Sequence, residues 1–295
     1  MFLNRVTVAL LVCLGCVGMY AADSSSAPKN KKNLVISSIP ENVKLIIGET
    51  NEKNYVPRVK AIHALPATMP PDQIEACLEF LAKKIETQTL PDLQFNGLKN
   101  ELVFVLMRQK KKPEALAMHL VKMYNDKSYD ITWRDYCVQF FGKWYPQAPN
   151  NQGRKEMVNC LWNALKHERN SRIAGAASAQ LCFLSRKFPE ISKKDVVAAS
   201  LEALDDPKCV NISKVAILQT CAILGEVKAL PIARKIATEG KNPLMRASAI
   251  AAVGMLGDEK DLEFLKKLET SRDPRLHRPA QAAIQKITSR RNTKK

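Results

Sequence analysis

Most of the chain consists of segments in which apolar residues recur every three or four positions, separated by Pro, Gly and Asp. In the middle of the chain this pattern predicts helices over residues 95–110, 113–125, 131–144, 152–167, 170–187 and 193–205. The chain has only 11 glycines and lacks evenly spaced alternating segments bounded by Asn-Gly or Asp-Gly turns, which counts against a β-sandwich or barrel. The predicted fold class is therefore all-α.

The C-terminal third of the sequence repeats itself. Leu224-Gly225 aligns with Leu256-Gly257, an offset of 32 residues (256 minus 224), and the apolar positions of the preceding helix then coincide. These positions are Ile217, Leu218 and Cys221 in one copy and Ala249, Ile250 and Val253 in the next. A third copy begins at Asp273-Pro274. Repeats of this length predict a solenoid of paired helices, in which each hairpin buries its apolar stripe against its neighbours.

The same signature is present nearer the N-terminus, over residues 55–85. In this region, Leu78-Glu79-Phe80-Leu81 has the same residues as Leu262-Glu263-Phe264-Leu265. Between residues 95 and 190 the paired helices continue without a clean period, so we interpret the repeat as degenerate in that region. Clear repeats thus cover 55–85 and 209–288, within a predicted repeat domain over 41–288.

The stretch from Pro243 to Asp258, followed by Leu262 to Leu268, resembles a short bacterial HEAT-like repeat of the armadillo-type class. Tetratricopeptide and ankyrin repeats have similar periods. The copies lack the Trp, Gly and Tyr pattern of the first, and only Arg275-Leu276-His277-Arg278 is similar to the second. The HEAT-like resemblance implies an α-α superhelix that serves as a scaffold, with the second helix of each pair on the concave side.

The N-terminal residues 1–22 have the order of a secretory signal peptide. Arg5 precedes an uncharged apolar run from Val6 to Tyr20, and two alanines follow. We therefore expect export to the periplasm, the cell envelope or the medium. A basic flexible linker is expected over 23–40 and a basic tail over 289–295.

Two alternatives to a cleaved signal peptide stay open. Lys29, Lys31 and Lys32 flank the apolar run and would hold that side of an uncleaved membrane anchor in the cytoplasm. Leu14-Gly15-Cys16 resembles a degenerate lipobox, which makes Cys16 a candidate for lipid attachment.

Six cysteines follow residue 22. Cys77, Cys160 and Cys221 lie at helical spacing from apolar neighbours, which predicts that they are small core residues. The sequence has no Cys-x-x-Cys pair among them, so it indicates neither a zinc site nor a redox site. Cys209, in the loop after Pro207, is the candidate for a disulfide bond, with Cys182 or Cys221 as its partner.

Catalytic signatures are missing from the sequence. Its four histidines, His63, His119, His167 and His277, are scattered over different repeats, and no two are spaced to bind one metal ion. HEAT-like metal hydroxylases use several His-Glu pairs, whereas this chain has one, His167-Glu168. We therefore expect a non-enzymatic protein, with no catalytic residues, no cofactor and no metal.

The net charge of +17 includes +7 at the two ends and +10 over the body of the chain. Arg234-Lys235 and Lys266-Lys267 occupy equivalent positions in adjacent second helices, so they are candidate partner-binding residues. A solvated helical face would explain them equally. We expect a protein partner, with an anionic polymer or a membrane surface as alternatives.

A nucleic-acid-binding solenoid, similar to the HEAT-like alkylpurine DNA glycosylases, is the rival interpretation of the basic charge. Export from the cytoplasm counts against it, because an exported protein does not normally meet DNA. Steeply salt-dependent binding in a protein that keeps its N-terminal segment would favour it.

Aromatic residues gather between Tyr124 and Tyr145. Trp133 and Trp144 follow helical spacing, which predicts core packing. Tyr136 and Tyr145 are the two candidates for lining a peptide or glycan groove. The sequence as a whole therefore predicts an exported helical-repeat scaffold that mediates protein–protein interactions.

Overall fold

The computed structural model describes residues 39–48, 55–84 and 92–293, and it is all-α over these residues. The helices are α2 (Glu41–Ile46), α3 (Tyr55–His63), α4 (Pro71–Leu81), α5 (Leu93–Arg108), α6 (Leu116–Asn125), α7 (Ile131–Trp144), α8 (Asn151–His167), α9 (Ile173–Ser185), α10 (Lys193–Asp205), α11 (Asn211–Ile223), α12 (Leu230–Glu239), α13 (Pro243–Leu256), α14 (Leu262–Glu269) and α15 (Pro274–Asn292). Short 3-10 turns η2 (Tyr145–Gln147), η3 (Val227–Ala229) and η4 (Glu259–Asp261) join some of them. The predicted fold class and the six predicted middle helices are confirmed.

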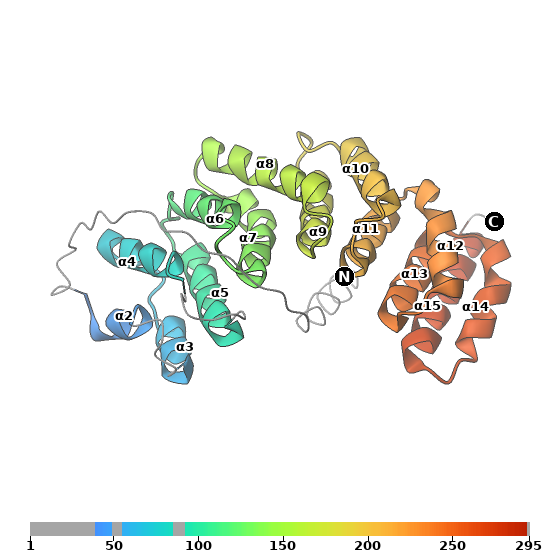
Figure 1. Cartoon of the computed structure of the whole chain (residues 1–295), viewed down its shortest axis with the longest axis horizontal. Coiled ribbons are helices and arrows are strands. Elements are labelled where there is room, and N and C mark those ends of the chain that lie inside the picture. Colours follow the sequence, from blue (N-terminus) through green and yellow to red (C-terminus); the bar gives the residue numbers. More distant parts are fainter. Residues whose placement is uncertain (1–38, 49–54, 85–91, 294–295) are drawn as a thin grey trace.

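The helices form two rows that together make a shallow arch (Figure 1). The odd-numbered helices α3 to α15, here called the inner row, pack side by side along the inner side of the arch. The even-numbered helices α2 to α14, the outer row, cover them from outside. Neighbours in the inner row run in the same direction (Figure 1). Two of the pairs are in register, because His63 in α3 lies 2.9 Å from Glu101 in α5 and the Gly175 N–H of α9 donates to Ser213 Oγ of α11 at 3.0 Å.

The 32-residue period predicted from the sequence coincides with the structural repeat. Shifting residues 211–223 of α11 by 32 places them on residues 243–255, which lie in α13. The same shift places η3 on η4 and the start of α12 on the start of α14. Each repeat is therefore one inner helix followed by one outer helix.

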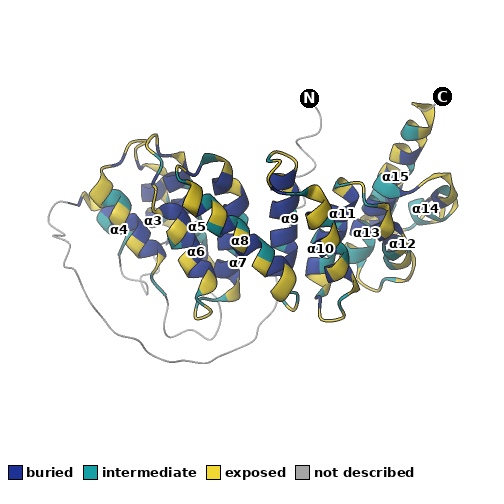
Figure 2. Ribbon diagram, turned by 90° about the horizontal axis from the view of Figure 1, so that it is seen from above, coloured by how far each residue is buried: buried dark blue, intermediate teal, exposed yellow. Residues whose placement is uncertain are grey.

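Small residues allow the inner helices to approach one another closely. Ala249, Ala252 and Ala280 are fully buried between neighbouring helices, as is Ala283 at 1% exposure. In the middle of the inner row, α9 has no charged residue and is largely buried (Figure 2). The outer helices instead have one apolar face and one polar face, as expected for the covering layer of a solenoid.

An arginine at the fourth position of an inner helix recurs in three repeats. Arg58 donates to the carbonyl of Ile46 at 2.8 Å, Arg134 to that of Tyr124 at 2.8 Å, and Arg246 to that of Ala237 at 3.0 Å. Each acceptor lies in the last turn of the preceding outer helix, where backbone carbonyls lack helical partners. The guanidinium group thus joins one repeat to the next.

The predicted signal peptide, most of the predicted linker and the candidate lipid-attachment residue Cys16 lie outside the described residues. Among the helices of the described part, none combines the length and the apolar character that crossing a bilayer requires.

The predicted disulfide at Cys209 is wrong, because all six cysteines within the described ranges are buried free thiols. The core placement of Cys77, Cys160 and Cys221 is confirmed, with exposed fractions of 0%, 5% and 0%. Burial raises the pKa of the Cys77 and Cys221 thiols to about 12. These cysteines therefore contribute to packing and not to reactivity.

Candidate functional site

The two basic pairs singled out in the sequence lie on the outer row, in α12 and α14, so the expectation that they line the concave side is corrected (Figure 1). Arg234 is neutralised by Asp261, with Nε–Oδ1 and Nη2–Oδ2 distances of 2.7 and 2.9 Å. Lys267 pairs with Glu263 one helical turn away, at 2.9 Å. The surface around the two basic pairs therefore has both positive and negative side chains.

A shallow hollow of about 460 Å³ lies between these two outer helices. Arg234 and Lys235 line it together with Lys260 and Phe264, and the acidic side chains of Glu239 and Asp261 share the same walls. Lys266 and Lys267 are exposed outside this set of lining residues. The hollow thus brings one of the two basic pairs into a concavity, in a nearly neutral setting.

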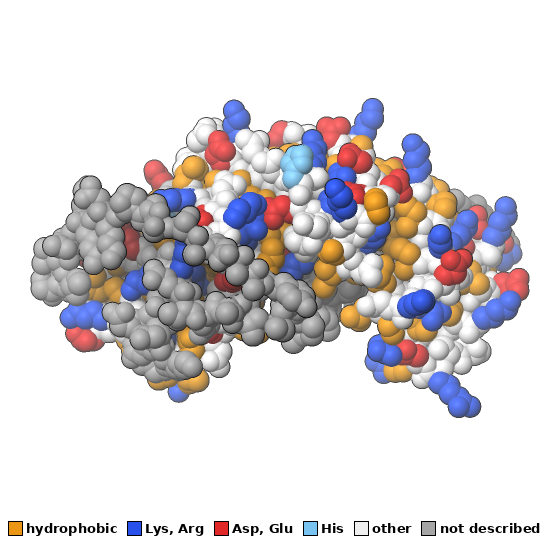
Figure 3. Space-filling model, viewed as in Figure 1, with side chains coloured by type: hydrophobic (Ala, Val, Ile, Leu, Met, Phe, Trp, Pro, Cys, Tyr) orange, Lys and Arg blue, Asp and Glu red, His pale blue; other side chains and the backbone are white. Residues whose placement is uncertain are grey.

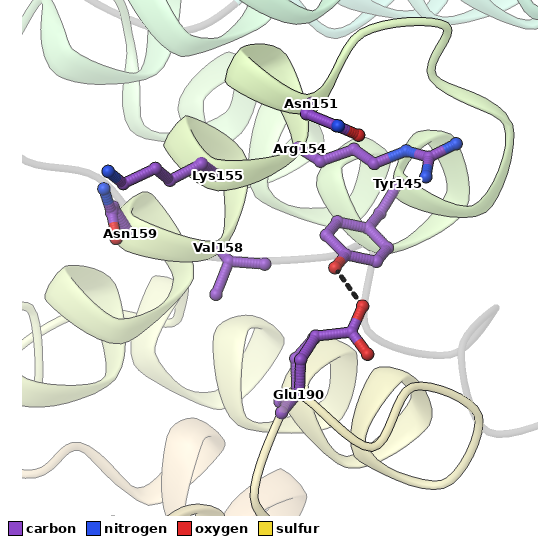
Figure 4. Close-up of a pocket in the computed structure, with 8 residues that line it drawn as sticks. Tyr145, Asn151, Arg154, Lys155, Val158, Asn159 and Glu190 are labelled. Carbon is purple, nitrogen blue, oxygen red and sulfur yellow. Dashed lines mark hydrogen bonds between the residues drawn. The ribbon is translucent and has the colours of Figure 1, made fainter.

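Tyr145 lies in a second hollow, of about 330 Å³, formed by η2, α8 and the loop before α10 (Figure 4). Its ring is buried and packs edge-on against Phe188 with 4.9 Å between ring centroids. Its hydroxyl donates to Glu190 at 2.8 Å. Burial and this hydrogen bond raise the pKa of Tyr145 to about 12, so the phenol stays neutral. Arg154 and Lys155 provide the basic side of the hollow.

Tyr136 does not share this hollow. It lies on the inner row, half-buried, with its ring edge-on to Trp133 at 6.4 Å between centroids. The two tyrosines are thus not brought together into the single groove that the sequence indicated. The rest of the aromatic cluster is core as predicted, since Trp133 and Trp144 are fully buried.

The net charge differs between the two rows of helices, which the net charge of the whole sequence does not reveal. Within the described helices, the inner row has thirteen Lys and Arg and two Asp and Glu, a net charge of +11. The outer row has eleven of each kind and a net charge of zero. Blue and red side chains accordingly alternate along the outer edge (Figure 3). The inner row is therefore the electropositive side of the arch.

Both acidic residues of the inner row have a basic side chain as a partner. Glu101 lies 2.9 Å from His63, and Asp135 is buried with its carboxylate 2.6 Å from Arg172 Nη2.

Arg58, Lys99 and Arg134 are buried, and the other ten Lys and Arg residues of the inner row are partly or fully exposed. Two of these ten form ion pairs, Arg275 with Asp273 and Arg291 with Glu259.

Exposed apolar side chains also concentrate on the inner row. Of the nine large apolar side chains that are exposed among the described residues, seven belong to its helices. They are Val56, Leu93, Ile131, Phe183, Ile212, Ile223 and Leu244. Exposed apolar side chains near exposed cations are typical of a surface that binds a partner.

Two lysines lie over aromatic rings on this surface. Lys143 Nζ is 4.6 Å from the centroid of Phe104, and Lys187 Nζ is 4.3 Å from that of Phe183. Desolvation lowers the pKa of Lys143. Sequence analysis missed these pairs, since each lysine and its ring come together only through helix packing or the turn after a helix.

Lys99 is a buried cation that the sequence did not single out. It is 1% exposed, with Nζ 4.1 Å from the Trp133 ring centroid and 5.2 Å from that of Phe95. It donates to the Lys83 carbonyl at 3.1 Å, just beyond the end of α4. Burial lowers the pKa of Lys99 to about 7. Its enclosure makes it a structural link between repeats and not an accessible nucleophile.

No group of three or more His, Cys, Asp or Glu residues that could hold a metal ion is present in the described part of the chain. His63 is exposed, with 54% of its side chain accessible.

Comparison with known proteins assigns neither a family nor a function to the chain. No protein family matches the sequence, and no curated protein matches it. Among solved structures, one crystal structure of an engineered protein is 15% identical, with a TM-score of 0.40, over 83% of this chain and 68% of the other. A second engineered protein is 18% identical, with a TM-score of 0.27, over 85% of this chain and 98% of the other. The all-α fold and its helical-repeat packing are shown by the helices of the described residues and their contacts.

Proposed function

We propose that this protein is a non-enzymatic, HEAT-like scaffold whose inner row binds an acidic protein partner. One observation carries the proposal: the inner row combines a net charge of +11 with most of the exposed apolar side chains, while the outer row has no net charge. The extended surface that a solenoid leaves free suits protein binding. The 32-residue hairpins and the Pro243–Asp258 stretch support the HEAT-like assignment.

The partner is proposed to lie outside the cytoplasm, because residues 1–22 have the order of a secretory signal peptide. N-terminal sequencing of the protein purified from its native host tests this. A new N-terminus near Asp23 supports export, and an intact Met1 in a cytoplasmic fraction contradicts it.

Charge reversal on each row tests where binding occurs. The inner-row double variant is Lys143→Glu with Arg278→Glu, and the matched outer-row variant is Lys235→Glu with Lys266→Glu, all at exposed positions. The probe is fluorescent poly-glutamate of about 20 residues, followed by anisotropy at about 50 and 200 mM salt. We expect the inner-row change to weaken binding about tenfold and the outer-row change to weaken it about twofold or less.

Equal losses of poly-glutamate affinity in the two variants would mean that binding depends on total charge, and would contradict the proposal. The second candidate function, nucleic-acid binding, rests on the same positive row. It would be favoured if a DNA duplex bound more tightly than poly-glutamate and its affinity fell steeply with salt.

A further inference from the structure

We propose that the inner face from α7 to α11 binds an acidic amphipathic helix of the partner. The apolar side of that helix rests on Phe183 and Ile223, and its carboxylates meet Lys143 and Lys187. This inference rests on the proposed function and specifies the chemistry of the partner segment.

Phe183 and Ile223 lie at the same end of two adjacent parallel helices. Gly175 and Ser213, each the third residue of its helix, are in direct contact, which sets α9 and α11 in register. Phe183 and Ile223 are then the eleventh and thirteenth residues of those helices. Their exposed fractions are 39% and 38%, so both side chains offer apolar area to a partner.

The other partly exposed side chains on this face of α9 are short and uncharged. The partly exposed positions of α9 that precede Phe183 by helical spacing are Ala176 and Ala179. Residues of this size allow a partner helix to approach to the usual interaxial distance of about 8–10 Å. Because α9 has no charged residue and α11 has only Lys214, the floor carries no acidic group that would repel carboxylates.

Cations flank this apolar floor on the side of α7 and at the end of α9. Lys143 and Lys187 are exposed. Lys187 Nζ lies over the ring of Phe183, which holds its ammonium group at the floor, whereas Lys143 Nζ lies over Phe104 of α5, at the edge of α7 away from α9. Within the described residues, neither lysine forms an ion pair. Both are therefore free to bind carboxylates beside an apolar contact.

The pattern fits a peptide helix better than DNA or a bilayer. A DNA duplex presents about one phosphate charge per 1.7 Å, whereas the helices α7, α9 and α11 together contain three basic residues, one of which, Arg134, is buried. A bilayer is too flat to reach the inner side of an arch (Figure 1). A helix with apolar residues at i, i+3, i+4 and i+7 and glutamates elsewhere matches both parts of the surface.

Two labelled peptides of equal length and equal glutamate content test the inference on the full chain. One has leucines at i, i+3, i+4 and i+7, and the other has serines at those positions. We expect the leucine peptide to bind about tenfold more tightly, and Phe183→Ser or Ile223→Ser to remove most of that advantage. Met118→Ser is the matched control, because Met118 is 43% exposed but belongs to the outer row, and it should change nothing.

The outcomes separate the two proposals. If both peptides bind equally and inner-row charge reversal weakens both, the acidic-partner function stands and the amphipathic helix is wrong. If neither binds, both proposals fail. Tighter binding of duplex DNA or of phosphatidylserine vesicles than of the leucine peptide would also overturn the inference.

A second measurement avoids dependence on the folding of the serine variants. A photoreactive leucine analogue in the peptide should cross-link to α9 or α11 of the unmodified protein, as mapped by mass spectrometry. Cross-links confined to outer-row helices would contradict the proposed site.

Discussion

Gly254 of α13 lies so close to Ala283 of α15 that a Cβ on the glycine would be 2.7 Å from both the Cα and the Cβ of the alanine. Because one of these atoms belongs to the backbone, the contact cannot be relieved by a side-chain rotation. The spacing of the last inner helices therefore depends on the absence of a side chain at this position.

Gly254→Ala should destabilise the protein by about 1–3 kcal/mol, because the added methyl forces α13 and α15 apart. Urea unfolding measures the change. Gly97→Ala is the control, since nothing lies within 4 Å of a Cβ built there. Removing that helical glycine should stabilise the protein by about 0.5–1 kcal/mol. A stabilising Gly254→Ala would show that the two helices are less closely packed than described.

Ala249→Asp should cost several kcal/mol, because it buries an unpaired carboxylate between repeats. Ala282→Asp makes the same chemical change at an exposed position of α15 and should be nearly neutral. Thermal melting of the two variants gives the comparison. Similar melting temperatures would contradict the alignment of the repeats.

Glu168 should make stability depend on acid pH. Its carboxylate accepts hydrogen bonds from Tyr124, Lys127 and Arg134, and together they hold its pKa below the ordinary value despite partial burial. Because the folded pKa is depressed, this stabilisation is complete above the unfolded pKa and is lost as the pH falls through the folded value.

Glu168→Gln should therefore be less stable than the wild type by about 2 kcal/mol at neutral pH, with the difference shrinking below about pH 4. Urea titrations at several pH values measure it. Glu263→Gln, at an exposed ion pair on α14, should show little change at any pH. A Glu168→Gln difference that stays constant down to acid pH would rule out this role.

Lys99 should make stability depend on alkaline pH. Its pKa is about 7 in the folded protein, against 10.5 for an ordinary lysine in water, so between these values the unfolded chain binds one proton more than the folded chain. The wild type should then gain stability relative to Lys99→Met as the pH rises from about 7 to 10, by about 1 kcal/mol per pH unit. Exposed Lys60→Met should show no such trend. A stability difference between the wild type and Lys99→Met that does not change with pH would indicate an ordinary lysine pKa.

The cysteines should react with alkylating reagents slowly in the native protein and rapidly in urea. Burial raises the pKa of Cys77 and Cys137 to about 12, which lowers the thiolate fraction by at least about a hundredfold at pH 8. Mass spectrometry after alkylation in urea without reductant should find Cys182, Cys209 and Cys221 all labelled. An unlabelled pair would reveal the disulfide that the structure lacks.

The amino-acid sequence by itself determined the local structure of this protein and its repeat. Helix boundaries follow from apolar spacing and from Pro, Asp and Asn at helix starts, as at Asp130 before α7 and Asn242 before α13. The match of Leu78-Glu79-Phe80-Leu81 with Leu262-Glu263-Phe264-Leu265 was likewise visible in the sequence, whereas the shared role of Arg58 and Arg246 as donors to the preceding helix was not.

Only the tertiary structure decided which row of helices faces inward. That choice placed Arg234 and Lys266 on the outer side and brought Lys143 over Phe104 on the inner side. Spacing along the chain defines which face of a helix is apolar, but the curvature of a solenoid depends on how closely adjacent helices pack in each row. Contacts such as Gly254 against Ala283 set that distance, and they join residues whose proximity no local pattern encodes.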